Sequence, residues 1–583
     1  MEERIKVWDG VVSRELDLPL PLKEPKPYHR IEPNNTEATF EQNGATWTIM
    51  GANAPIVNPD IYPKNWPLKG NNFEVLTISE PVTNYRILPF TENIENAIKS
   101  DTLSITAARD SYEPTSFVIR TGDSPLKNIG IEIDDLKMEI NDRQGNASYQ
   151  SLPKSLIDIR VVKCWYQAGI AISDATHKVL VPELLLHDDD VVRVDYAGQV
   201  NMIRNHKELV DSENLQPFSI PARQNKQIWL TIHITKDIQP GEYKGLLKIK
   251  SDTRSQAVNL NIRVLPFILP TPVLDYALYY EGHLADSDDK PKVTWLIKTA
   301  TQMKAELEDM IAHGLTNAPV WHQIDQDKAQ WEKDWVRLRK TLDIRNELGW
   351  GNQPLLYLDW KVSLKENHDL YKEKIKEILS VAQEKGIKEV YIYGVDEKIG
   401  EELAQLKPLY KTVHEEGAKN FVAGQLKHFL KYADSLIDLM VVTGPHSDAK
   451  VKQILTAKHQ GNKVLSYANP IAGLEEAATY HQNYGINLYL SGANGTLNFN
   501  YQAGSWNDWI SKTGVGRPHV MAYPTVDKPI STLQWEGWRE GINDVRFLSL
   551  ALQINKFDSH SLVGKSPKRQ RELLLKYILS NSG

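Results

Sequence analysis

Short apolar runs separated by turn residues dominate the chain between residues 91 and 268. The runs are rich in β-branched and aromatic residues, which is typical of strands, and Pro240-Gly241 marks a turn between two of them. They lie at residues 116–120, 156–162, 191–196, 227–234, 245–249 and 258–266. Several short strands with turns between them predict a β-sandwich.

A different pattern begins after Pro266, Pro270 and Pro272, which form a stiff connector. Short apolar strands now alternate with charged amphipathic helices, of which the clearest is predicted over residues 371–385. We predict strands at residues 276–280, 317–321, 355–359, 389–393, 420–423, 438–442, 463–467 and 487–490. Eight βα units in succession predict a (β/α)8 barrel of the TIM type.

These patterns divide the 583 residues into four segments. Residues 1–90 are rich in Pro and Asn and predict an extended strand-and-loop segment, and residues 91–268 form the predicted sandwich. Residues 269–555 form the predicted barrel, and residues 556–583 a helical tail. The fold class is therefore multidomain β plus α/β, with an N-terminal β-sandwich followed by a (β/α)8 barrel.

Composition and charge narrow the classes of function. With 41% hydrophobic and 25% charged residues the chain is an ordinary globular protein, not a disordered or collagen-like one. The net charge of −7 offers no basic excess for phosphates, which disfavours a nucleic-acid partner. Cys164 is the single cysteine, so neither an intramolecular disulfide nor a cysteine zinc site is predicted. Fifteen Trp and 24 Tyr residues favour carbohydrate, whose apolar ring faces stack on aromatic side chains.

Targeting signals are not recognisable in the sequence. It begins Met-Glu-Glu-Arg-Ile-Lys without an apolar signal core, and its most apolar stretch, residues 264–280, contains three prolines and Asp275. We therefore expect a soluble protein without a membrane span, either cytoplasmic or exported with its signal removed. The oligomeric state is left open.

Polar and aromatic residues follow the predicted barrel strands, where active sites of such barrels lie. Carboxylates, amides, His and aromatic rings together suit a sugar site, because acids protonate glycosidic oxygens and amides bind hydroxyls. The candidates for substrate binding are Glu281, His322, Asp359, Trp360, Tyr467, Asn469, Asn498, Tyr501 and Trp506.

Asp396-Glu397, after the fourth predicted strand, is the sharpest feature. Both could simply be loop carboxylates, one of them capping the following helix. Alternatively they act together: most glycosidases place two carboxyls on opposite sides of the scissile bond, which neighbours on one loop cannot easily do. Two carboxyls on one side suit substrate-assisted hydrolysis, in which the sugar's own 2-acetamido oxygen attacks the anomeric carbon.

Four motifs carry a resemblance to a known family. Tyr391-Ile-Tyr-Gly-Val-Asp-Glu397 resembles the Asp-Glu motif of glycoside hydrolase family 123 and its relatives, although Lys398 stands where relatives commonly have Pro. The segments 523–524 and 531–548 are similar to that group's closing segment, 108–114 to the opening strand of its sandwich, and 240–245 to its closing hairpin. The resemblance covers about residues 91 to 550.

The resemblance implies a sandwich followed by a barrel, and β-N-acetylgalactosaminidase-type activity by a retaining, acetamido-assisted route. By position, it implies Glu397 as general acid/base, with a raised pKa, and Asp396 as the residue that orients the acetamido group. No metal or cofactor is predicted, because neither His-Glu-x-x-His nor a phosphate-binding or dinucleotide-binding glycine motif occurs.

Two alternatives are open. A glycosidase of the same architecture acting on a sugar without the acetamido group needs a separate nucleophile, for which Asp359 or Glu281 is the candidate. A non-catalytic glycan-binding protein keeps the barrel and its aromatic rim.

Overall fold

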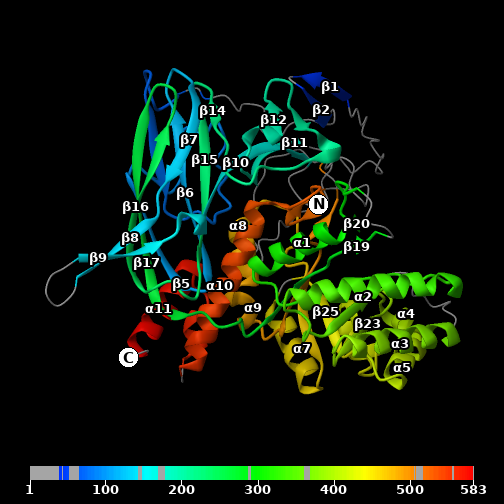
Figure 1. Ribbon diagram of the computed structural model, residues 1–583. Helices are drawn as coiled ribbons and strands as arrows, with labels where there is room; N and C mark the ends of the chain where they lie inside the picture. Colours follow the sequence, from blue (N-terminus) through cyan, green and yellow to red (C-terminus); the bar gives the residue numbers. More distant parts are fainter. Residues whose placement is uncertain are drawn as a thin grey trace, which may run out of the picture.

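The structure is a computed structural model of the chain. It describes residues 38–42, 44–50, 63, 65–141, 147–168, 178–285, 290–359, 368–444, 446–504, 506, 517–554 and 557–581. Largely antiparallel sheets form the N-terminal part, and a parallel sheet with its helices forms the C-terminal part (Figure 1). No helix of these described residues is both long and apolar enough to cross a membrane.

Two large sheets make up most of the N-terminal part. In spatial order, the six-stranded sheet contains β11 (Lys178–Leu186), β10 (Ile157–Ala168), β15 (Asn225–Ile234), β6 (Ser111–Thr121), β3 (Phe73–Ile78) and β4 (Ala97–Ile98). The seven-stranded sheet contains β14 (Phe218–Ile220), β7 (Leu126–Ile133), β16 (Gly241–Lys250), β17 (Ser255–Ile268) and β5 (Thr102–Arg109), with β8 (Leu136–Asn141) and β9 (Ala147–Leu152) beside them. Because β3 belongs to the first sheet, that sheet starts before residue 91.

One hydrophobic core joins these two sheets. Alternate residues of β17, including Val258, Leu260 and Ile262, are buried, as expected for a strand with one face toward a core. They share a cluster with Phe117 and Ile119 of β6, which belongs to the other sheet. A small separate sheet contains β1 (Ala38–Gln42), β2 (Ala45–Met50), β13 (Val200–Arg204) and β12 (Val192–Asp195).

Eight parallel strands form a curled sheet in the C-terminal part, called the parallel sheet below. Their order is β18 (Asp275–Leu278), β27 (Gly495–Asn498), β26 (Lys463–Tyr467), β25 (Leu439–Thr443), β24 (Lys419–Gly424), β23 (Val390–Tyr393), β22 (Leu355–Leu358) and β21 (Val320–Trp321). A parallel bridge between Ala277 of β18 and Asn317, just before β21, links the two ends of this order. Parallel strands place all their carboxyl ends at one edge.

Helices connect these strands and bury the outer face of the parallel sheet. They are α1 (Ala300–Ala312), α2 (Trp331–Glu347), α3 (His368–Glu384), α4 (Gly400–Gln405), α5 (Lys407–Glu415), α6 (Leu426–Tyr432), α7 (Asp448–His459), α8 (Ala477–Tyr484) and α9 (Ile486–Leu490), followed by α10 (Leu533–Gln553) and α11 (Pro567–Asn581). The helix expected at residues 371–385 is confirmed as α3, which buries Ile375 and Ile378. The short strands are β19 (His283–Leu284), β20 (Ile297–Lys298), β28 (Gln502–Ala503), β29 (His519–Val520), β30 (Ala522–Tyr523) and β31 (Ile530–Ser531).

Seven of the eight strands predicted for this part overlap observed strands, and the last prediction is wrong. Residues 487–490 belong to helix α9, which packs on α10, and the strand is β27 instead. A short apolar run fits a helix or a strand equally well, so packing decides.

In β27, a Cβ on Gly495 would lie 1.9 Å from the carbonyl oxygen of Asp275, so this position accepts no side chain.

Helix α10 joins the two parts of the molecule, and most of its residues are buried. Figure 1 shows it between the large sheets and the helices around the parallel sheet. Asn543 of α10 donates to the carbonyl of Tyr112 in β6 at 2.7 Å, and Arg546 donates to Asp110 at 2.8 Å. The segment that resembles the family's closing segment therefore forms the junction.

Candidate active site

The carboxyl edge of the parallel sheet collects the candidate side chains. Asp396 and Glu397 follow β23, and Asp359 follows β22, its direct neighbour. His322 follows β21 on the far side of β22, whereas Tyr467 is the last residue of β26.

Backbone contacts fix the loop that carries the pair. Gly394 N–H donates to the carbonyl of Phe421 at 3.0 Å, and Glu397 N–H to that of Ala423 at 3.2 Å, so the loop lies along β24. Glu397 has φ of +50°, a left-handed conformation that residues other than glycine seldom adopt and that is frequent at functional sites. The cap of the following helix α4 is Ile399, whose side chain forms no capping bond, so the capping role weighed for the pair is not seen.

The two carboxyls differ in burial and in partners. Asp396 is half-buried and accepts a 2.5 Å hydrogen bond from the Tyr393 hydroxyl. Burial raises the pKa of Asp396, and the Tyr393 bond opposes part of that rise. Glu397 is exposed, but the partial burial of its carboxyl, followed by the charge of Asp396, raises its pKa too. The pair therefore favours one ionised carboxyl beside one protonated carboxyl.

Aromatic rings from three further strand ends lie beside this pair. Tyr279 has Phe499 at 5.9 Å, Tyr467 at 6.1 Å and Tyr393 at 6.3 Å between ring centres. Burial and then the carboxylates of Glu397 and Asp396 raise the pKa of the half-buried Tyr467, which keeps its phenol protonated. The rings offer apolar surface and a hydroxyl donor, both of which a sugar uses.

Three other predicted residues lie at the same edge with little exposure. His322 is buried, and burial followed by Arg337 and His283 lowers its pKa to about 3, so the ring is neutral at ordinary pH. Asp359 is 7% exposed. Asn469 is 3% exposed, and its Oδ1 has no hydrogen-bond partner among the described residues, which makes it a free acceptor. Trp360, also predicted, lies outside the described residues.

Four further predicted substrate-binding residues are buried and hydrogen-bonded within the fold, and their part in substrate binding stays a prediction. Glu281 is fully buried and accepts a hydrogen bond from Asn500 at 3.2 Å. Asn498 bonds the backbone of residues 468 and 470, and Tyr501 donates to Asp309 at 2.8 Å. Trp506 donates to the carbonyl of residue 524 at 2.7 Å, among Trp and Tyr rings at the junction. Their side chains are occupied by the fold.

Tyr393 and Tyr279 were not among the predicted site residues. A signal for Tyr393 exists in the sequence: Tyr391 and Tyr393 are two apart in a strand, so both face the same side, and Tyr393 precedes Asp396 by three residues. Residues on that side of β23 belong to the hydrophobic cluster that the strands of the curled parallel sheet share.

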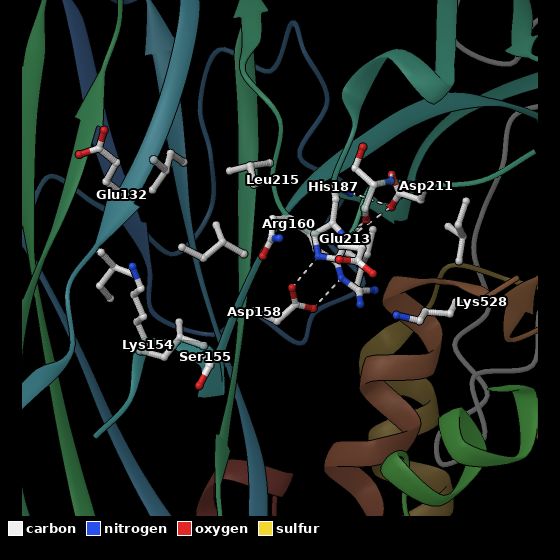
Figure 2. Close-up of a pocket in the computed structure, with 18 of the residues that line it drawn as sticks. Glu132, Lys154, Ser155, Asp158, Arg160, His187, Asp211, Glu213, Leu215 and Lys528 are labelled. Carbon is white, nitrogen blue, oxygen red and sulfur yellow. Dashed lines mark hydrogen bonds and ion pairs between the residues drawn. The ribbon is translucent and has the colours of Figure 1, made fainter. Parts of the chain in front are cut away.

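A large cavity lies elsewhere, between the N-terminal sheets and the turn at residues 527–530 (Figure 2). Its volume is about 710 Å³, and none of the predicted site residues that the structure describes lines it. His187 lines it, 2.6 Å from Asp158 and 2.8 Å from the carbonyl of Ser212, and Arg160 lies 2.7 Å from the same Asp158. His187 and Asp158 therefore have partners within the fold. Among the described residues, no group of three or more His, Cys, Asp or Glu is placed to hold a metal ion.

The carboxyl edge of the curled parallel sheet thus carries an Asp-Glu pair, phenols and a neutral His. Residues 317–551 match the family model described as glycoside hydrolase 123, catalytic domain. The predicted resemblance to glycoside hydrolase family 123 is thereby confirmed, and it indicates a glycosidase.

A solved structure of family 123 supports the fold, and two others align with much lower TM-scores. A family 123 glycoside hydrolase from Clostridium perfringens, studied for glycolipid glycan hydrolysis, aligns over 87% of this chain and 98% of its own, with 13% identity and a TM-score of 0.58. β-Glucuronidase 3 from Bacteroides uniformis aligns over 75% of this chain and 51% of its own, with 9% identity and a TM-score of 0.28. A β-glucuronidase from Parabacteroides merdae aligns over 64% of this chain and 49% of its own, with 9% identity and a TM-score of 0.25. No curated protein matches the sequence.

Proposed function

We propose that this protein hydrolyses β-linked 2-acetamido sugars, N-acetylgalactosaminides foremost, with retention and through an oxazolinium intermediate. The observation that carries the proposal is the Asp396–Glu397 pair: two neighbouring carboxyls on one loop, both with raised pKa. Neighbours on one loop lie on one side of a bound sugar, where the acetamido group and the leaving oxygen are found. In this proposal the parallel sheet is a closed (β/α)8 barrel, and the N-terminal sheets are a β-sandwich.

The first step breaks the glycosidic bond. The acetamido oxygen attacks the anomeric carbon, the bond to the leaving oxygen breaks, and Glu397 transfers its proton to that oxygen. Asp396, ionised, accepts the hydrogen bond of the acetamido N–H and stabilises the positive charge that develops on the oxazolinium.

The second step releases the sugar. Glu397, now ionised, removes a proton from water while the water oxygen attacks the anomeric carbon from the side that the leaving group vacated. The carbon–oxygen bond of the oxazolinium breaks, the acetamido group is restored, and Glu397 is protonated again. Two inversions give net retention.

Sugar recognition is assigned to the residues beside the pair. Tyr467 offers a protonated phenol, His322 a neutral ring, and Asn469 a buried acceptor. Asp359, on the strand next to β23, completes the set.

The route with a separate protein nucleophile finds less support. Glu281, one of its two candidates, is fully buried and bonded to Asn500. Asp359, the other, is no more buried than the residues assigned to sugar recognition, so its exposure does not decide between the two roles.

Paired substrates test the proposal. Aryl β-N-acetylgalactosaminide and β-N-acetylglucosaminide are compared with the plain galactoside and glucoside, using wild type, Glu397→Gln and the control Glu401→Gln, an exposed residue in the first turn of α4. We expect cleavage of the acetamido sugars alone, lost in Glu397→Gln and kept in Glu401→Gln. Cleavage of plain glycosides at a similar rate would overturn the assisted mechanism, and cleavage of none would favour a glycan-binding protein.

A further inference from the structure

Tyr393 is held rigidly beneath the Asp396–Glu397 loop. It is the last residue of β23 and 2% exposed. Its ring meets Phe421 of β24 at 4.8 Å and 64°, and Tyr279, just after β18, at 6.3 Å and 85°. Rings from three strands thus fix the direction of the phenol.

The hydroxyl of Tyr393 points at the carboxyl of Asp396. The oxygen lies 2.5 Å from Asp396 Oδ1, and burial raises the pKa of the phenol well above its usual value, so the hydroxyl keeps its proton and donates it. A charge-assisted hydrogen bond of this length is strong and directional. It holds Oδ1, and the backbone N–H of Glu397 also bonds this carboxyl, so the direction of the carboxylate toward a substrate amide is set from two sides.

We propose that Tyr393 is a positioning residue for acetamido-assisted hydrolysis: its hydroxyl orients the Asp396 carboxylate and keeps it ionised for the substrate's N–H. The inference rests on the proposed function, because only an assisted mechanism needs an anionic acceptor at that place. It explains what offsets part of the burial effect on a half-buried carboxyl that has no cation partner among the described residues.

The groups around Asp396 show why its carboxylate needs a hydrogen-bond donor. Glu397 lies beside it, and the phenols of Tyr393, Tyr279 and Tyr467 face it from β23, from the end of β18 and from β26. Among the described residues, no Lys, Arg or His forms an ion pair with Asp396. Burial raises its pKa, and the Tyr393 bond lowers it. Loss of the hydroxyl therefore raises the pKa of Asp396 further.

The test compares two identical substitutions on one strand. Tyr391 lies on the same face of β23 as Tyr393, but its hydroxyl donates to Glu389, before the start of the strand, at 3.2 Å. For an aryl 2-acetamido glycoside we expect Tyr393→Phe to lower kcat about tenfold or more, the size of a lost bond to a charged group. The acid limb of its kcat/KM profile moves to higher pH, whereas Tyr391→Phe resembles wild type.

A double variant makes the test independent of protein stability. Once Asp396→Asn has removed the charge, adding Tyr393→Phe costs little more, so the two effects are not additive. Additive effects, an unmoved acid limb, or equal losses in Tyr391→Phe and Tyr393→Phe would overturn the inference. Failure of the proposed function looks different: wild type then spares acetamido sugars, or Glu397→Gln retains activity.

Discussion

The carboxylates at the carboxyl edge of the parallel sheet and those on α10 have opposite surroundings. Glu536 and Asp544 of α10 are buried, and each contacts cations: Glu536 pairs with Arg539, and Asp544 with Arg571 and His481. Burial would raise the pKa of both carboxyls, but these charges lower it below the ordinary value. At the edge, burial raises the pKa of Asp396 and Glu397, and no Lys, Arg or His in the described part of the chain forms an ion pair with either.

The contrast separates carboxylates that hold the fold from those that act. A buried carboxylate with a cation is fixed in one ionisation state and joins elements, as Asp544 joins α10 to α11 through Arg571. A carboxylate without a cation can gain and lose a proton near working pH, which general acid–base catalysis requires. The sequence pattern singles out Asp396 and Glu397 by their place after a strand, whereas the cation beside Asp544, Arg571 of α11, is known only from the structure.

Glu397→Gln gives the largest expected effect. Losing the general acid lowers kcat/KM for an aryl acetamido glycoside about 10²–10⁴-fold. Because Glu397 is exposed and lacks an ion pair among the described residues, the urea unfolding midpoint stays that of wild type. A variant that loses stability along with activity would place Glu397 with the carboxylates of α10.

Asp544→Asn should have the opposite effect: it lowers the stability of the fold and leaves the activity of the folded protein unchanged. Removing the charge leaves Arg571 buried with one partner fewer, which lowers the free energy of unfolding by roughly 3 kcal/mol. Activity per folded molecule remains, because the residue lies on α10 rather than at the edge. Asp134→Asn, which breaks an exposed pair with Lys248 at 3.0 Å, is the control and should leave the urea midpoint close to that of wild type.

The difference in stability between wild type and Asp544→Asn should also depend on pH, and the direction of that dependence can be predicted. The folded pKa of Asp544 is lowered, so its contribution to stability is present above the unfolded value near 3.8 and is lost as pH falls through the folded value. Urea unfolding at several pH values should show wild type and Asp544→Asn converging in acid. A gap that stays constant down to the lowest pH would contradict the ion pair as its cause.

The pH profile of hydrolysis should depend on the two carboxyls at the carboxyl edge, Asp396 and Glu397. Asp396 must be ionised and Glu397 protonated, so activity falls as pH drops through the pKa of the first and as pH rises through that of the second. Since burial raises both, and the charge of Asp396 raises that of Glu397 further, both limbs lie above ordinary carboxyl values. In Asp396→Asn the residual activity should lack the acid limb, and its persistence there would reassign that limb.

Local patterns predicted seven of the eight strands of the parallel sheet and the Asp396–Glu397 loop, because period and strand ends are properties of neighbouring residues. The burial of Tyr501 and Trp506 could not be predicted, because it depends on the partners that the fold brings to them, Asp309 and the carbonyl of residue 524. The same holds for Glu281, which the fold brings to Asn500. An aromatic or acidic residue after a strand looks the same in the sequence whether its side chain points toward solvent or into the core.

Lys398 gives the smallest expected effect, and it tests how sharply function is confined to the pair. It follows Glu397 at the position where family relatives commonly have Pro, and its amine lies 3.3 Å from Glu402 on the surface of α4. An exposed pair one helical turn apart contributes about 0.5 kcal/mol or less. Lys398→Ala should therefore change neither the urea midpoint nor kcat/KM by a measurable amount. A clear fall in kcat/KM at unchanged stability would extend the site beyond Glu397, because the lysine would then act on substrate and not on Glu402.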